Sequence, residues 1–213
     1  MFTFKKIRLG SILILFLVVV GCTKVNPAEE IYHHLEKAVS LEAPFEEQQE
    51  PLSKAENDEY ELYDQILGLA DLDEIKALAT QAEEIAVTRK SMIEKERESI
   101  DEAYNEFLLI TTILETIEDE DLKKAAEELV TIMENRYETY IELYNEYKFA
   151  IELDLELYNL IQKEDLTIDE LETQHDKVNA SYERLIVTKI CLTSSQSNIM
   201  TSNEIFTSLQ NLK

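Results

Sequence analysis

Apolar residues recur three and four positions apart along most of this chain, which is the spacing that places them on one face of an α-helix. The clearest apolar face is made of Leu129, Met133, Tyr140, Tyr144, Ile151, Leu155 and Tyr158. Four such stretches follow one another, at residues 29–68, 73–116, 119–162 and 167–210, and the turns between them are short. The pattern therefore predicts four long helical segments.

Short connections force consecutive helices to run antiparallel, and similar lengths allow each apolar face to be buried along its whole run. We therefore predict an all-α fold: an elongated antiparallel bundle of three to four long helices, arranged up-down-up-down and about 60 Å long. The number of helices depends on Pro44 and Pro51, because a proline removes a hydrogen bond inside a helix and a kink or restart is expected there. If they break the first segment, its first half becomes a tether and the core is closer to three-helical.

The turns carry recognisable start and stop signals. Residues 71–74 include three carboxylates at the start of a helix, where the helix dipole favours negative charge. Thr167 and Glu170 have the T-x-x-E spacing of a capping box, which predicts the start of the last helix. Gly68 is expected to end the first segment.

Acidic residues outnumber basic ones by 45 to 20, so the formal net charge is −25. Removal of residues 1–21, which contain three basic and no acidic residues, would make the chain still more acidic. Such a surface repels the phosphates of nucleic acid, because binding to them is driven by Lys and Arg. Nucleic acid is therefore not an expected partner.

The N-terminus has the order of a secretory signal: a basic start, an apolar run and a small residue. Lys5, Lys6 and Arg8 precede an apolar run at residues 12–20. This run is short for a membrane span, which needs about 20 apolar residues. The sequence therefore predicts export.

The apolar run ends in a motif that resembles the bacterial lipobox, formed by Val19, Val20, Gly21 and Cys22. In a lipobox the Cys thiol receives a diacylglycerol and becomes the new N-terminus. We therefore predict a lipoprotein signal peptide at residues 1–21, the lipidated Cys and a tether at residues 22–28, and a single helical-bundle domain at residues 29–213. The alternative is a buried Cys22 at the end of an uncleaved anchor.

With Cys22 lipidated, Cys191 is the only remaining thiol, so no disulfide within one chain is expected. Cys191 lies between Ile190 and Leu192, which favours a small buried hydrophobic residue. A reactive thiol would need a His or a cationic partner, and only Lys189 is close in sequence.

Two Glu-x-x-His pairs, Glu30 with His33 and Glu172 with His175, have the spacing of ligands in bundle di-iron proteins. They lie near the starts of the first and fourth helices, which are opposite ends of an up-down bundle, so we expect no metal site. No nucleophile–base pair is visible, and Gly68, the only glycine after residue 21, cannot form a Gly-rich phosphate loop. We expect neither an enzyme nor a bound cofactor.

Four tyrosines share one side of a predicted helix: Tyr137, Tyr140, Tyr144 and Tyr147. A tyrosine can stack on a sugar ring while its hydroxyl forms hydrogen bonds, so one interpretation is a glycan-stacking face. The other is a place in the core, since these residues continue the apolar face of Leu129 and Met133.

Charged side chains dominate residues 89–98, where only Met92 and Ile93 are apolar. Such a run usually covers the solvent-facing side of a helix. We therefore predict a solvated face here rather than a ligand site.

Five stretches together resemble one family: residues 42–52 (EAPFEEQQEPL), 61–66 (ELYDQI), 89–101, 136–148 and 157–167. Their order and spacing are similar to those of the YkyA-like putative cell-wall binding lipoproteins of Gram-positive bacteria. The resemblance covers residues 30–187 and ends at about Thr188. It implies a helical bundle tethered outside the cell, and it offers no catalytic residues to carry over.

We therefore expect a non-enzymatic protein, lipid-anchored through Cys22 at the extracellular face of the cell membrane, that contacts the peptidoglycan of the cell wall. The alternative is an envelope spacer or scaffold that binds another surface or membrane protein. The outermost surface would be the turns at residues 68–74 and 163–167. The oligomeric state is left open by the sequence.

Overall fold

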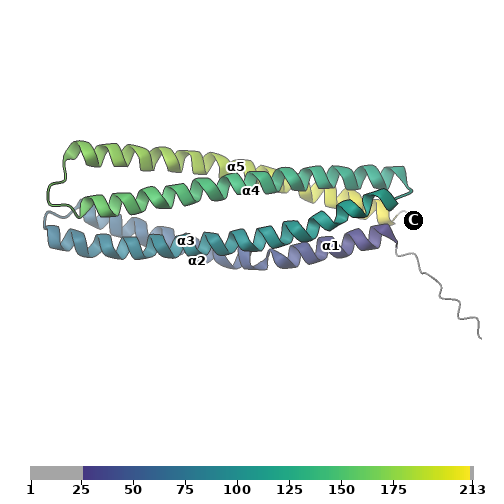
Figure 1. The fold of residues 1–213 in the computed structure, drawn as a ribbon, viewed down its shortest axis with the longest axis horizontal. Helices are drawn as coiled ribbons and strands as arrows, with labels where there is room; N and C mark the ends of the chain where they lie inside the picture. The colour runs from purple at the N-terminus through teal and green to yellow at the C-terminus, as the bar shows by residue number, and fades with distance from the viewer. Residues whose placement is uncertain (1–25, 212–213) are drawn as a thin grey trace, which may run out of the picture.

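The computed structural model describes residues 26–211, with side chains described for residues 26–192. Its five α-helices are α1 (Pro27–Leu41), α2 (Ala43–Leu67), α3 (Leu72–Leu108), α4 (Glu120–Ile161) and α5 (Ile168–Asn211). Two short 3-10 helices, η1 (Leu109–Thr112) and η2 (Leu114–Thr116), connect α3 to α4. Residues 26–211 contain no strand, and the predicted all-α bundle is confirmed (Figure 1).

The first predicted segment is divided into α1 and α2 at Glu42, as expected from the proline that follows. Pro44 occupies the first turn of α2, where its missing N–H is not needed, while Pro51 lies inside the same helix. α1 packs against α3 and buries Ile31 completely. The first half of this segment is therefore part of the bundle rather than a tether, and the bundle is four-helical.

The predicted start signals act as helix caps. The side chain of Asp71 accepts from the backbone N–H groups of Asp73 and Glu74, each at 3.0 Å. The capping box is reciprocal: the Thr167 backbone N–H donates to the Glu170 carboxylate at 3.0 Å, and the Glu170 N–H donates to the Thr167 hydroxyl at 3.3 Å. These side chains satisfy N–H groups that have no partner within the helix.

The second predicted segment is not helical to its end. α3 ends at Leu108, and the hydroxyls of Thr111, Thr112 and Thr116 each donate to the carbonyl three residues earlier, at 2.7–2.8 Å. Side-chain bonds of this kind compete with the α-helical ladder. The chain therefore tightens into η1 and η2 before Asp119 caps α4 by accepting from the Leu122 N–H at 3.0 Å.

The bundle has two distinct ends, visible in Figure 1. The near end holds the start of α1 and the α3–α4 connection, and the far end holds the α2–α3 and α4–α5 turns. One hydrophobic cluster fills the near end around Ile31 and Phe107, and another fills the far half around Ile93 and Leu157. This is the predicted up-down-up-down arrangement.

Candidate functional site

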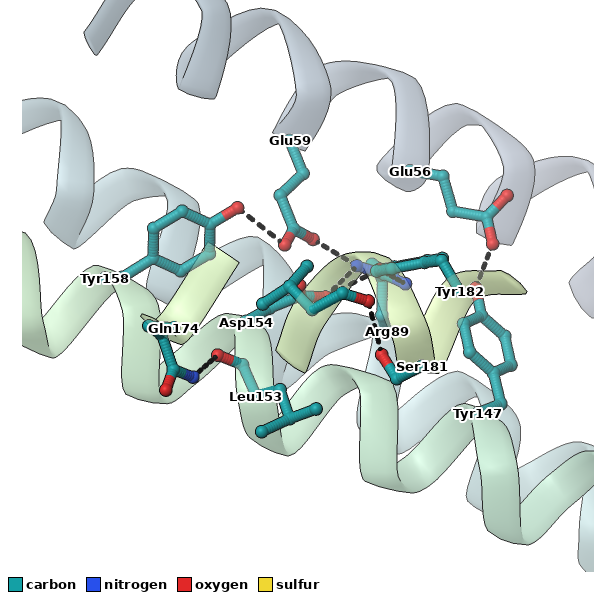
Figure 2. A network of polar contacts seen from close by, with 11 residues as sticks. Glu56, Glu59, Arg89, Tyr147, Leu153, Asp154, Tyr158, Gln174, Ser181 and Tyr182 are labelled. Carbon is teal, nitrogen blue, oxygen red and sulfur yellow. Dashed lines mark hydrogen bonds and ion pairs between the residues drawn. The ribbon is translucent and has the colours of Figure 1, made fainter. Parts of the chain in front are cut away.

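A buried arginine connects four helices in the far half of the bundle. Arg89 in α3 is only 2% exposed. Its Nη1 atom donates to a carboxylate oxygen of Glu59 in α2 at 2.7 Å and to one of Asp154 in α4 at 3.2 Å. Its Nη2 atom donates to the hydroxyl of Tyr182 in α5 at 2.9 Å (Figure 2). Since each partner comes from a different helix, Arg89 holds the four together.

Tyrosine hydroxyls complete this group, which we call the Arg89 cluster: Arg89, Glu59, Asp154, Tyr158 and Tyr182. The Tyr182 hydroxyl donates to Asp154 at 2.6 Å, and the Tyr158 hydroxyl donates to Glu59 at 2.9 Å. Hydrogen bonds to carboxylates are stronger than those between neutral groups. The cluster therefore fixes the relative positions of the helices that supply it.

The charges of the Arg89 cluster do not cancel, because two carboxylates face one guanidinium. Burial raises the pKa of Glu59 and that of Asp154 above their ordinary values, while Arg89 opposes the shift at both. Arg89 stays protonated, as arginine does in proteins, and its guanidinium lies 5.3 Å from the ring centre of Tyr147. Among residues 26–192, its Nε–H is the one buried side-chain polar group without a hydrogen-bond partner.

The prediction of a solvated face at residues 89–98 is wrong for Arg89 and Glu96, which are both buried. The reason is their register. The inward positions of α3 are Ala82, Ala86, Arg89, Ile93, Glu96 and Ile100, which recur four and three residues apart. The spacing of apolar residues on either side could have shown that these two charged residues face the interior.

Two cavities lie end to end between α2 and α5, because α2 packs against α3 while α5 packs against α4. The one nearer the far end has a volume of about 560 Å³ and is lined by members of the Arg89 cluster. The other has a volume of about 410 Å³. Glu56, Leu185 and Lys189 line both, so we treat them as one continuous feature, the α2–α5 groove. Volumes of this size are typical of small-molecule sites.

Three members of the predicted tyrosine series line the groove, and the fourth, Tyr137, does not. Tyr140, Tyr144 and Tyr147 line the smaller cavity of the α2–α5 groove. Tyr140 and Tyr147 are buried, and the hydroxyl of Tyr147 donates to Glu56 (Figure 2). Glycan stacking by these residues stays a prediction.

Tyr137 has other partners. Its ring stacks on that of Tyr104 with centres 3.8 Å apart, and its hydroxyl donates to Asp101 at 2.8 Å. Arg97 donates to the same carboxylate at 2.7 Å and lies over the Tyr137 ring, 5.9 Å from its centre. Tyr137 is therefore held outside the groove by its own contacts.

The two Glu-x-x-His pairs lie apart, one in α1 at the near end and the other in the first part of α5. His175 is hydrogen-bonded through Nε2 to the hydroxyl of Tyr63 at the edge of the groove. In the part of the chain that the structure describes, no three or more His, Cys, Asp or Glu side chains gather in a way that could hold a metal ion.

The prediction of a buried Cys191 is wrong, because this side chain is exposed. The inward positions at this level of α5 are Leu185, Thr188 and Leu192, which follow the helical spacing. Cys191 falls between them on the outer side, next to the exposed Ile190.

The lipobox formed by Val19, Val20, Gly21 and Cys22 lies outside the described residues. Across residues 26–211, no helix combines the length and the apolar character needed to cross a bilayer.

A solved structure shares this architecture. A conserved protein of unknown function from Staphylococcus aureus is similar to the chain with a TM-score of 0.74. The match covers 87% of this chain and 98% of that one, at 12% sequence identity. At this identity the likeness shows the fold alone, that of an elongated helical bundle.

Sequence comparison defines the class more closely, as that of lipoproteins. A family described as "Putative cell-wall binding lipoprotein" matches residues 26–190. The chain is also 37% identical over 182 residues to an uncharacterized lipoprotein, YkyA, from Bacillus subtilis strain 168. This match covers 84% of this chain and 82% of that protein. The chain belongs to the YkyA family.

Proposed function

We propose that this protein is anchored by a lipid on Cys22 to the outer face of the cell membrane and contacts the peptidoglycan without catalysing a reaction. The description of its family supports this function. The observation that carries it is the lining of the α2–α5 groove, where Tyr140, Tyr144 and Tyr147 surround a cavity of about 410 Å³. Aromatic rings and hydroxyl groups in a cavity of this size suit a sugar-containing ligand.

The shape of the bundle fits this role. Because α1 begins at the near end, an anchor at Cys22 holds that end toward the membrane. The α2–α3 and α4–α5 turns are then outermost. The negative surface is repelled by anionic lipids only within about 8 Å, so a rod that stands off the membrane avoids most of this repulsion.

Sedimentation with purified wall sacculi tests the proposal. The chain without residues 1–21 and with Cys22→Ser is mixed with sacculi, with and without Mg²⁺ to screen the acidic surface. We expect cosedimentation above that of an unrelated protein of similar charge. No binding under either condition would refute wall contact.

A second function, that of a scaffold for another envelope protein, is favoured by the exposed face of α5. Ile186, Val187 and Ile190 are all more than half exposed, and exposed apolar side chains that lie together often mark protein contacts. Photo-crosslinking from position 187 in cells distinguishes the two functions. Recovery of a membrane protein rather than muropeptides would support the scaffold.

A further inference from the structure

The larger cavity of the α2–α5 groove combines tyrosine rings with carboxylates. Tyr60 at its rim is 70% exposed, and Tyr63, Tyr158 and Tyr182 are further inside. Tyr60 is therefore not part of the core, and its exposed ring is available to a ligand in the cavity. Rings of this kind attract cations through the negative charge on their faces.

Acidic groups predominate along the whole groove. Its two cavities are lined by four carboxylates, an arginine, a lysine and a histidine: Glu56, Glu59, Glu96, Asp154, Arg89, Lys189 and His175. Burial raises the pKa of Glu59 and Asp154 and raises that of Glu96 to about 7, so a nearby cation would favour the ionised form of these carboxylates. A cation in the groove would supply part of the missing positive charge.

Other ligand classes fit less well. Phosphates and carboxylates would be repelled by the acidic lining and by the net charge of the chain. An acyl chain would cover the polar side chains of the Arg89 cluster without forming hydrogen bonds with them. Burying polar groups in this way is unfavourable. A hard metal ion would need several converging oxygen ligands, whereas Glu59 and Asp154 are already held by Arg89.

We propose that the α2–α5 groove binds an organic ammonium group, with Glu56 as the counter-charge and the ring of Tyr60 as a cation–π partner. Glu56 lines both cavities, as Lys189 does, so it faces the middle of the groove. One of its carboxylate oxygens accepts from the Tyr147 hydroxyl, and a carboxylate can accept further hydrogen bonds from an ammonium group. The inference deepens the proposed function and rests on it, because wall stem peptides can carry an amine beside sugar rings. The smaller cavity with Tyr140, Tyr144 and Tyr147 would then hold the sugar, and the larger one the amine.

Calorimetric titration of the delipidated chain with three probes tests the inference. The probes are a muropeptide with a free stem-peptide amine, the same muropeptide acetylated at that amine, and pentane-1,5-diamine. We expect acetylation to weaken binding at least about tenfold, because it removes the charge that both Glu56 and Tyr60 recognise. We also expect binding of the amine form to weaken with added salt.

Variants of Tyr60 test whether the ligand binds in the α2–α5 groove. We expect Tyr60→Ala to weaken binding of the muropeptide with a free amine about two- to fivefold. Tyr60→Phe should keep full affinity, because the aromatic ring makes the interaction with the cation. Tyr32→Ala is the matched control, because Tyr32 is an exposed helical tyrosine (44%) in α1, outside the groove. Nitrogen-15 NMR spectra of Tyr60→Ala check that the fold is kept.

The outcomes separate the two proposals. Equal binding of the amine and acetylated forms, or equal effects of Tyr60→Ala and Tyr32→Ala, would overturn the ammonium site. If sacculi bind but no soluble amine does, the ammonium site is wrong and wall contact stands. If the diamine binds as tightly as the muropeptide, the ammonium site is supported and its ligand is a small amine rather than a wall fragment.

Discussion

Replacing Arg89 by Met is expected to destabilise the bundle strongly, because Arg89 is a buried counter-ion in its far half. Met keeps an unbranched, flexible apolar side chain and has no charge, so the substitution removes the guanidinium while filling part of its space. Glu59 and Asp154 are then left in a buried site without their counter-ion. Removing one partner of a buried ion pair typically lowers the free energy of unfolding by about 3–5 kcal/mol. For a chain of this length, that corresponds to a fall of about 6–20 °C in melting temperature.

The assay is urea unfolding followed by circular dichroism at 222 nm, at pH 8 and at pH 5. The matched control is Arg184→Met, because Arg184 pairs with Glu146 at 3.0 Å but is half exposed. An exposed ion pair contributes less than about 1 kcal/mol. If Arg89→Met and Arg184→Met cost the same, Arg89 is not balancing buried charge and the reasoning is refuted.

The pH dependence and a rescue provide two further checks. The carboxylates left behind have folded-state pKa values above their unfolded values, so the stability of Arg89→Met should fall as pH rises through that interval. The loss should therefore be smaller at pH 5 than at pH 8. Adding Glu59→Gln and Asp154→Asn to Arg89→Met removes the buried charges and should restore most of the lost stability. A triple variant as unstable as the single one would point to packing instead.

Three other predictions concern separate parts of the chain. Glu96 has a pKa raised to about 7 by burial and by the charge of Glu56, so its contribution to stability is lost as pH rises from its unfolded value to about 7. Glu96→Gln, which can still accept from Gln49, should therefore stabilise the protein by about 1 kcal/mol or more at pH 8 and have little effect at pH 4, as measured by urea unfolding. Thr167→Ala removes the hydroxyl of the capping box and should cost about 1 kcal/mol; an unchanged unfolding midpoint would contradict this. Cys22→Ala should abolish metabolic labelling with a radioactive fatty acid, and equal labelling of both chains would exclude lipidation at this residue.

Much of the fold could be predicted because local signals and the global pattern agree. The spacing of apolar residues predicted the helices, and the capping box at Thr167 predicted where α5 begins. The division of the first segment followed from Pro44. The end of α3 was missed because the threonine hydroxyls that compete with its ladder are compatible with a helical pattern.

The Arg89 cluster was missed for a different reason. A charged residue among apolar ones is interpreted as solvent-exposed unless its counter-ions are known. The partners of Arg89 are distant in sequence: Glu59, Asp154 and Tyr182 are 30, 65 and 93 residues away from it. Their proximity depends on the lateral arrangement of the helices, which the spacing within each helix does not determine. The α2–α5 groove was invisible for the same reason: it results from which helices pack together and which do not.

If Cys22 carries the proposed lipid anchor, the position of the groove along the bundle sets its height above the membrane. Glu56, where its two cavities meet, lies 29 residues after Pro27, and α1 and α2 follow one another along the long axis (Figure 1). At about 1.5 Å per residue, the middle of the groove is about 45 Å from the start of α1. With Cys22 held in the bilayer, this distance is several times the Debye length of about 8 Å. Lipid charge would then have little effect on what the groove binds, and only polymer that approaches the membrane to within the length of the rod could be captured.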